Sequence, residues 1–481
     1  MNQDAFDVAV VGAGPAGLAA ALAAAESGVT VALIDAGVGP GGQYWRSPAP
    51  GAGTFKPNTL HHSWRRFTDT TTRLSALASA GRAVRFAGHH VWSIAQADDR
   101  WSLHCNVGAE PRQRDAQPPV TIHARRLVLA TGAYDRQLPF PGWDLPGVMT
   151  AGGVQSLLKG HLVVAGETVV VAGTGPFLLP VAVGLARYGA RVAAVIEANT
   201  PLAFTRSPRA VFGAINKLGE AATYGVALLR HRVAVRHRHA VIRAFGNDRL
   251  EGVVVARLDR DGRPLADTER SVACDLLAVG WGFTPQLELH LQLGCATRMD
   301  VDSSLIVDVD DNQQTTVEGV WAAGESTGVG GADLASVEGM IAGYAVARSL
   351  DATPVRNDVP LRRRRGALRE FATVMHRVYS IPDALLDDVD DETLVCRCEE
   401  VTAGSLRRAV DELGATDPRT VKLLVRPGMG WCQGRVCGFA TVCLTARHTG
   451  RAAVDSDMRA FADRPIATPT PLGSLARLAD D

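Results

Sequence analysis

One stretch near the start of the chain limits the possible folds more than any other. VAVVGAGPAG, which begins at Val8, places Gly12, Gly14 and Gly17 between β-branched residues and a run of alanines. This order predicts a buried parallel strand, a tight turn at Gly12 and a helix, with Gly14 leaving room for a pyrophosphate and Gly17 letting the helix pack closely. Asp35 ends the next expected strand, VTVALID, where a carboxylate can bind an adenosine ribose. The stretch therefore predicts a dinucleotide-binding unit, and its glycines argue against a membrane span.

A second candidate unit follows in the middle of the chain. ETVVVAGTGPFLLPVAVGLARYGARVAAVIEAN repeats the strand, turn and helix, and Gly173 and Gly175 match the first two glycines of the fingerprint. Leu178 replaces the third glycine. The leucine side chain holds helix and strand apart, so the nucleotide site is weakened or altered. Glu197 would bind ribose hydroxyls and repel a 2′-phosphate, which favours NAD or another adenine nucleotide such as ATP over NADP. A working NADH site, a retained nucleotide without redox function and a purely structural repeat all stay open.

Two further segments resemble those that close the FAD site in the glutathione and thioredoxin reductase superfamily. RRLVLATGAYDRQLPFPGW and GVWAAGESTGVGG each read as a buried strand that ends at small residues. By this resemblance Glu325 stands where an acid, usually aspartate, binds the ribityl chain, and PGGQYW lies along the flavin. The residues that the resemblance assigns to FAD are Gly41, Gly42, Gln43, Thr131, Gly132, Gly324 and Glu325.

Two pairs of cysteines mark the carboxyl end. Cys396 and Cys398 in LVCRCEEVT are separated by one residue, and Cys432 and Cys437 in GWCQGRVCG by four. Four thiolates in two close pairs suit tetrahedral zinc or an iron–sulfur cluster, and the one-residue gap is tighter than zinc motifs usually have. We favour the iron–sulfur interpretation, with zinc and a disulfide as the alternatives.

The cysteine segments also resemble a known domain. CxCEEVT followed by RPGMGWCQGRVCG is similar to the bacterioferritin-associated-ferredoxin-like [2Fe-2S] domain, in the form fused to a flavoprotein in the A (alpha) subunits of opine oxidases, D-hydroxyproline and proline dehydrogenases, and hydrogen cyanide synthase. The similarity extends over nearly the whole chain, including GGQ, ATGAYDRQLPFPGWDLPGVMTAGGVQ, AVGWGFTP and AAGES. It implies that the four cysteines are the cluster ligands.

The resemblance also implies partners. In this family a separate B (beta) subunit, similar to amino-acid oxidases, carries its own flavin and oxidises a C–N bond. The alpha chain takes the electrons on to an acceptor, and a small ferredoxin-like subunit often completes the assembly. Whether an FMN lies between subunits stays open.

The expected fold is α/β, with two Rossmann-like dinucleotide-binding domains of the glutathione and thioredoxin reductase type, the second inserted in the first, and a small, mainly helical [2Fe-2S] domain. The expected ranges are 1–155 and 281–355 for the FAD domain, 156–280 for the second nucleotide domain, 356–392 for a linker with a helix, 393–450 for the [2Fe-2S] domain and 451–481 for a tail.

These observations predict a flavin and [2Fe-2S] electron-transfer subunit of a heteromeric amine or amino-acid dehydrogenase. They assign no catalytic residue. A self-sufficient NADH-dependent reductase of a protein acceptor and a non-catalytic, cofactor-holding scaffold are the alternatives. Fifty basic and fifty acidic residues leave no net charge to attract nucleic acid. The acidic start, MNQDAFD, and the low cysteine content favour the cytoplasm without a transmembrane segment, and peripheral attachment to the inner face of the membrane stays open.

Overall fold

The computed structural model describes residues 5–49, 56–108, 119–206, 215–387 and 389–478. Its first unit is a seven-stranded sheet of order β3-β2-β1-β6-β5-β4, in which β19 also pairs with β6. The pairs among β3, β2, β1, β6 and β19 are parallel, and β4 and β5 form an antiparallel extension. The strands are β1 (Phe6–Val11), β2 (Val31–Asp35), β3 (Ala83–Ala87), β4 (His89–Ala97), β5 (Arg100–Val107), β6 (Val120–Leu129) and β19 (Val320–Ala322).

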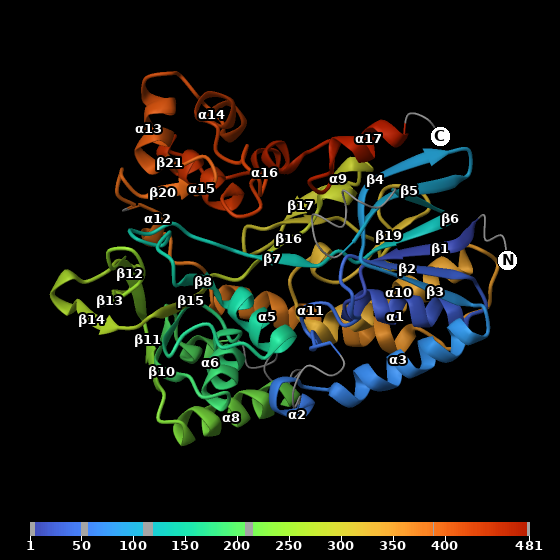
Figure 1. Ribbon diagram of the computed structural model, residues 1–481, viewed down its shortest axis with the longest axis horizontal. Coiled ribbons are helices and arrows are strands. Elements are labelled where there is room, and N and C mark those ends of the chain that lie inside the picture. The colour runs from blue at the N-terminus through green and yellow to red at the C-terminus, as the bar shows by residue number, and fades with distance from the viewer. Residues whose placement is uncertain (1–4, 50–55, 109–118, 207–214, 388, 479–481) are drawn as a thin grey trace.

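Helices rich in small residues cover this sheet (Figure 1). Helix α1 (Pro15–Glu26) begins at Gly14 with proline in its first turn and packs along α10 (Ala332–Arg348). A side chain at Gly339 would collide with the backbone of Ala16, so glycine is needed for this close approach. Helix α3 (Trp64–Ser79) packs on the outer side of α1, and the short α2 (Pro57–Leu60) lies near the second unit. The predicted strand, turn and helix at the start of the chain are confirmed.

The second unit is a parallel sheet of order β11-β10-β9-β15-β8, inserted in sequence between β6 and β19 of the first. Its strands are β8 (Val148–Thr150), β9 (Thr168–Gly173), β10 (Arg191–Glu197), β11 (Ala234–His237) and β15 (Leu276–Gly280). Its helices are α5 (Ala151–His161), α6 (Leu178–Arg187) and α8 (Ile215–Arg230), with the short η1 (Pro201–Arg206). Because β8 pairs with β15, the second sheet reaches back before residue 156, where we expected the second domain to begin.

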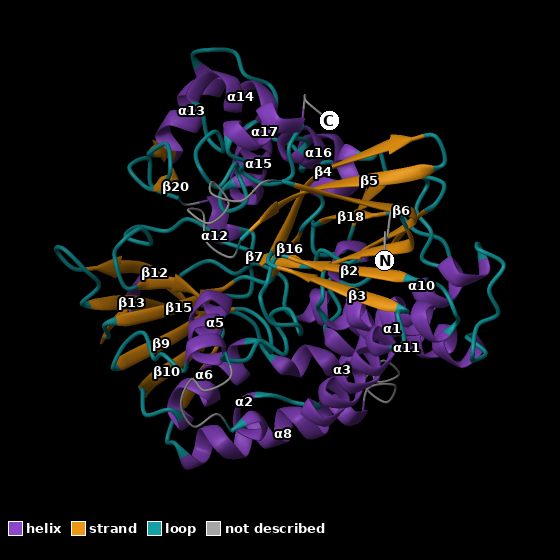
Figure 2. Ribbon diagram, turned by 45° about the vertical axis from the view of Figure 1, so that its right-hand side comes forward, coloured by secondary structure: helices purple, strands orange, loops and turns teal. Residues whose placement is uncertain are grey.

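Small elements join the two units. β7 (Ala133–Asp135), which follows β6, pairs antiparallel with β16 (Phe283–Pro285), which follows β15. The remaining elements of this region are β12 (His239–Phe245), β13 (Gly252–Arg257), η2 (Ala266–Thr268), β14 (Arg270–Ala273), α9 (Glu288–Gln292), β17 (Thr297–Met299), β18 (Leu305–Val307) and η3 (Glu325–Thr327). The two crossing segments thus lie side by side between the sheets (Figure 2).

Helix α11 (Val359–Val378) is the helix that we expected in the linker, and it spans both units. Near its start Arg362 donates to the Asn312 side chain at 2.7 Å and Arg365 pairs with Asp311, so these two arginines bind the protein body. Near its end the ring of Phe371 stacks on Phe204 of the second unit. The linker segment is therefore packed along its length.

The last unit is small and mainly helical, as predicted (Figure 1). It contains α12 (Ala384–Asp387), β20 (Leu394–Cys396), β21 (Val401–Thr402), α13 (Ala403–Asp411), α14 (Pro418–Val425), α15 (Gly438–His448), α16 (Asp455–Ala462) and α17 (Leu472–Leu478). Trp143 joins it to the body: its indole nitrogen donates to the Leu394 carbonyl at 2.6 Å, and the Arg397 guanidinium lies 4.9 Å from its ring centroid. Within the described residues, none of the helices has the length and apolar character needed to cross a bilayer.

Candidate functional site

Four loops of the first unit meet at the carboxyl edge of its sheet. A side chain at Gly12 would collide with the backbone of Ala130, which precedes Thr131, and one at Gly42 would place its Cβ 2.8 Å from Gly14 Cα. Gly41 and Gly42 both have positive φ, as this close packing of two loops requires. A Cβ at Gly324 would lie 2.9 Å from the Ala16 side chain. The loop after β19, which is the fourth loop, therefore packs against the start of α1.

Gly14 differs from its neighbours because its Cβ position is open. Only the Gly42 Cα lies within 4 Å of a Cβ built there, at 3.9 Å. The protein's own packing thus accounts for glycine at 12 and 17, where a Cβ would collide with backbone, but not at 14. A dinucleotide pyrophosphate that approaches the backbone beside the N-terminus of α1 would account for it. The residues present therefore fit the FAD that the sequence predicts.

The other residues that we predicted for this site lie around the four loops. Asp35 accepts hydrogen bonds from the backbone nitrogens of Ala13 (2.5 Å) and Gly37 (2.6 Å), and burial raises its pKa. Glu325 accepts from the nitrogens of Gly330 (3.2 Å) and Gly331 (3.0 Å), and burial raises its pKa to about 7. The Glu325 carboxylate thus binds the loop before α10.

Three predicted residues are engaged by the protein itself. The Thr131 hydroxyl donates to the carbonyl of Gln286 at 2.6 Å, and the Gly132 carbonyl accepts from the Gln286 nitrogen at 2.9 Å. The Gln43 amide oxygen accepts from Arg46 Nε at 3.1 Å. The two contacts with Gln286 tie the loop after β6 to the segment after β16, whereas the Gln43 contact lies within its own loop.

The second unit repeats the arrangement around Asp35. Glu197 accepts hydrogen bonds from the nitrogens of Gly175 (2.8 Å) and Asn199 (2.9 Å) and from the Thr174 hydroxyl (3.0 Å), and burial raises its pKa to about 7. A side chain at Gly173 would collide with the Gly280 backbone, whereas no atom lies within 4 Å of a Cβ at Gly175. The glycine positions and the acid therefore keep the geometry of a nucleotide-binding turn.

A difference appears in what covers the two acids. The residues after Asp35, at positions 36–39, are exposed. Beside Glu197, in contrast, the Asn199 side chain donates to the Ser380 carbonyl at 2.7 Å and the Thr174 hydroxyl donates to the Tyr379 carbonyl at 3.3 Å. The end of α11 therefore covers the edge of the second unit where a ribose is expected.

The four predicted cluster cysteines come together in the last unit. Hydrogen bonds from Cys437 lower the pKa of Cys396 to about 6 and that of Cys432 to about 5, and these same contacts raise the pKa of Cys437. Cys398 is exposed and interacts with Cys432. The structure thus links all four thiols, whereas Cys443, with a pKa raised to about 11 by burial, belongs to none of these contacts.

The donors around the thiols fit a two-iron cluster. The Gly428 nitrogen donates to Cys396 Sγ at 3.5 Å, and backbone hydrogen bonds from Val436 and Gly434 reach Cys432. Backbone N–H groups that donate to sulfur are a known feature of iron–sulfur sites. In the described part of the chain no group of three or more His, Cys, Asp or Glu side chains is arranged to hold a metal ion.

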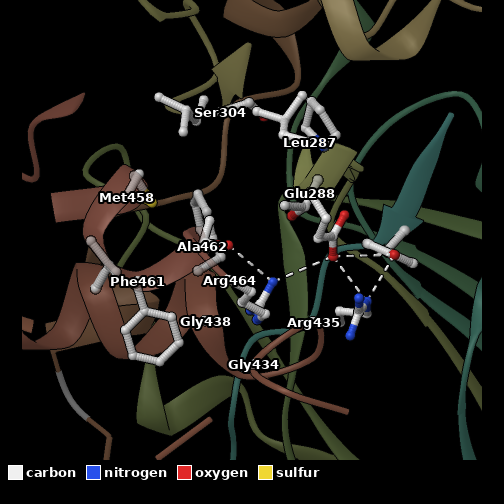
Figure 3. A pocket seen from close by; sticks show the side chains of 16 residues that line it. Leu287, Glu288, Ser304, Gly434, Arg435, Gly438, Met458, Phe461, Ala462 and Arg464 are labelled. Atoms are coloured by element: carbon white, nitrogen blue, oxygen red, sulfur yellow. Dashed lines mark hydrogen bonds and ion pairs between the residues drawn. The ribbon is translucent and has the colours of Figure 1, made fainter. Parts of the chain in front are cut away.

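The sequence analysis did not identify four candidate functional residues that form a buried network between the last unit and the flavin unit (Figure 3). They are Tyr134, Glu288, Arg435 and Arg464. Lys159, on α5, is a fifth: it is buried, its ammonium donates to the Tyr44 carbonyl at 3.0 Å, and burial lowers its pKa to about 8. Lys159 is a lone lysine within the apolar stretch SLLKG, which was the one local signal that could have singled it out.

Comparison with known proteins agrees with this architecture. The family model of pyridine nucleotide-disulphide oxidoreductases matches residues 6–347, and that of the BFD-like [2Fe-2S] binding domain matches residues 394–442. The hydrogen cyanide synthase subunit HcnB of Pseudomonas protegens is 31% identical over 446 residues, 89% of each chain. The alpha-type (A) chain of the opine oxidase of Rhizobium meliloti is 30% identical over 478 residues, 99% of each chain. Among solved structures, the L-proline dehydrogenase of P. horikoshii shares the fold with a TM-score of 0.70 at 21% identity, covering 98% of this chain and 80% of that one.

Fold and sites together define an oxidoreductase of two dinucleotide-binding units with a fused [2Fe-2S] binding domain. The chain belongs to the pyridine nucleotide-disulphide oxidoreductase family, and within it to the group that contains HcnB and the alpha-type chains of opine oxidases. Membership supports FAD and a [2Fe-2S] cluster as its cofactors.

Proposed function

We propose that this chain is the electron-transfer subunit of a heteromeric dehydrogenase that oxidises the C–N bond of an amine or amino acid of the opine, proline or hydroxyproline type. When bound, the flavin and the cluster supply a two-electron and a one-electron carrier on the same chain. One contact supports this most directly: Arg435, between Cys432 and Cys437, donates through Nε to the hydroxyl of Tyr134 at 2.9 Å. Tyr134 lies two positions after the predicted flavin residue Gly132, so the cluster loop is seated on the flavin unit.

We assign the cofactors to the residues that the structure brings together. FAD is held by Gly12, Gly14, Gly17, Asp35, Gly41, Gly42, Gln43, Thr131, Gly132, Gly324 and Glu325. The cluster is held by Cys396, Cys398, Cys432 and Cys437. The open Cβ position at Gly14 and the mutual contacts of the thiols support these assignments.

The oxidation itself is assigned to a partner. The relatives among opine oxidases and hydrogen cyanide synthases are, by their names, subunits of larger enzymes. We therefore propose an amino-acid-oxidase-like partner that carries the substrate site, and a small ferredoxin-like subunit that completes the assembly. An FMN at the subunit interface and a location in the cytoplasm, with or without peripheral attachment to the membrane, belong to the same proposal.

The second nucleotide unit receives a non-redox role in this account. Gly173, Gly175 and Glu197 keep the shape of a site for an adenine nucleotide such as NAD or ATP. The contacts of Tyr379 and Ser380 beside Glu197 argue against rapid exchange of a hydride donor there. This favours the subunit role over a self-sufficient NADH-dependent reductase.

Turnover with and without the partner tests the proposal. The purified chain is mixed with opines, proline, hydroxyproline or glycine and an artificial dye, alone and after assembly with the amino-acid-oxidase-like partner. We expect dye reduction only in the assembly, with reduction of the flavin on this chain. Dye reduction by the isolated chain would place the substrate site here, and an assembly that turns over without reducing this flavin would reduce the chain to a scaffold.

A further inference from the structure

A buried ion network lies where the last unit meets the flavin unit (Figure 3). Glu288 is the first residue of α9. One oxygen of its carboxylate lies 2.9 Å from Arg435 Nε and 3.4 Å from Arg464 Nη1. The exposed fractions of the three side chains are only 5%, 12% and 10%, respectively. Tyr134 adds a hydroxyl 3.4 Å from that oxygen. Two cations therefore converge on one anion inside the protein.

The network joins segments that are distant in sequence. Glu288 follows β16, which crosses between the two sheets, whereas Arg435 lies in the loop between two cluster cysteines and Arg464 follows α16. Arg435 is also fixed within its own loop, where Nη1 donates to the Cys432 carbonyl at 3.2 Å. Glu288 therefore adds a negative charge beside a cation that is already fixed in the cluster loop.

The apolar surroundings screen these charges only weakly. The pocket that contains them is walled by apolar side chains, including Leu287, Phe439 and Phe461. The second carboxylate oxygen of Glu288 is buried without a hydrogen-bond partner among the described residues. A buried ion pair stabilises a fold poorly compared with apolar packing, so a merely structural clamp is a weak explanation for this arrangement.

The cluster loop supplies a better explanation. Arg435 Nη1 donates to the Cys432 carbonyl, and a Cβ built at Gly434, in the same loop, would lie 3.2 Å from Arg464 Nη2, so both guanidinium groups stand at the cluster loop. Reduction of a [2Fe-2S] cluster by one electron adds one negative charge, and nearby charges shift its reduction potential. A cation beside the cluster favours the reduced form, and an anion disfavours it.

We propose that Glu288 sets the reduction potential of the cluster: its carboxylate offsets part of the positive charge that Arg435 and Arg464 place at the cluster loop. This rests on the proposed function, in which Cys432 is a cluster ligand. The inference goes beyond that function because it assigns the control of the potential to a residue of the flavin unit.

The test uses substitutions that change charge in opposite directions. Glu288→Gln should raise the midpoint potential of the cluster in an anaerobic redox titration followed by its paramagnetic signal, and Arg464→Gln and Arg435→Gln should lower it. A charge removed at this depth should change the ratio of reduced to oxidised cluster about tenfold at a fixed ambient potential, which is about 59 mV for one electron. Arg435→Lys keeps the charge and should stay nearer to the wild type than Arg435→Gln.

Asp308→Asn is the matched control, because it removes a carboxylate from an exposed ion pair with Arg298, in which both side chains are more than half exposed. Shifts no larger than this control, or shifts of one sign for both Glu288→Gln and Arg464→Gln, would overturn the inference. If Glu288→Gln does not retain its cluster, Arg464→Gln decides alone, since a lowered potential supports the inference and an unchanged or raised one overturns it. A wild type without iron would instead refute the proposed function.

Discussion

The hydroxyl of Thr174 donates to the carbonyl oxygen of Tyr379, 3.3 Å away, and so ties the second nucleotide unit to the end of α11. Asn199 makes a second such contact with Ser380 at 2.7 Å. Both contacts lie beside Glu197, the acid that would bind a ribose.

The first prediction follows from these two contacts beside Glu197. NADH added anaerobically to the purified chain should not bleach the flavin on the timescale of mixing, because backbone carbonyls of another segment bind Thr174 and Asn199 beside the acid that would hold its ribose. Dithionite added afterwards should bleach it and serves as the positive control. Rapid, stoichiometric bleaching by NADH would support the self-sufficient reductase.

The second prediction concerns the pH dependence of stability. Burial raises the pKa of Glu197 from 4.5 to about 7, so between these values the folded chain binds more protons than the unfolded one. The free energy of unfolding should therefore fall as pH rises through this window, by up to about 3 kcal/mol from this group, and the loss should be complete above pH 7.

Thermal melting between pH 4.5 and 8 checks this sign. Glu197→Gln should melt with a flatter pH dependence than the wild type, whereas Glu269→Gln, which removes an exposed carboxylate of the same unit, should keep the wild-type slope. A Glu197→Gln chain with an unchanged slope would show that this carboxylate does not titrate in the window.

The third prediction concerns the flavin cradle. Gly14→Val should fold but lose FAD, because the protein leaves the Cβ position at Gly14 open and the pyrophosphate needs that space. Gly366→Val is the control, since this glycine of α11 likewise has an open Cβ position, with no atom within 4 Å, but lies outside the cradle. The measurement is the flavin-to-protein ratio after purification. A full complement of FAD in Gly14→Val would reject our assignment of the pyrophosphate.

Local sequence patterns predicted the parts of the site that are local in sequence. The glycines of GAGPAG and GTGPFL mark strand–turn–helix units because their spacing reflects the backbone of one turn. The spacing of Cys396, Cys398, Cys432 and Cys437 likewise reflects two short loops. The sequence also predicted a helix in the linker, which is α11, but it could not show that the end of this helix rests on Thr174 and Asn199.

Contacts between distant segments had no such signal. Glu288 and Arg435 are separated in sequence by the rest of the flavin unit, helix α11 and the first part of the last unit, and each looks like an ordinary surface charge. Their burial depends on how the last unit packs against the flavin unit, which no periodicity in either segment reports. The network at Glu288 could therefore be found only in the folded chain.

The fourth prediction separates the two cofactors. Cys432→Ser replaces one thiolate ligand by a harder oxygen, so the cluster should be lost or its potential shifted, while FAD, held by loops of the first unit, should remain. Cys443→Ser is the matched control, because Cys443 lies on α15 in the same unit but outside the thiol contacts. Loss of flavin together with iron in Cys432→Ser, or loss of iron in Cys443→Ser, would contradict the assignment of ligands.

The most direct test of the whole account is the metal content of the anaerobically purified wild-type chain. The account predicts about two irons per chain, the content of one [2Fe-2S] centre with four cysteine ligands, and a paramagnetic signal after reduction by one electron. Stoichiometric zinc without iron, or free thiols without any metal, would contradict it and leave the chain without its one-electron carrier.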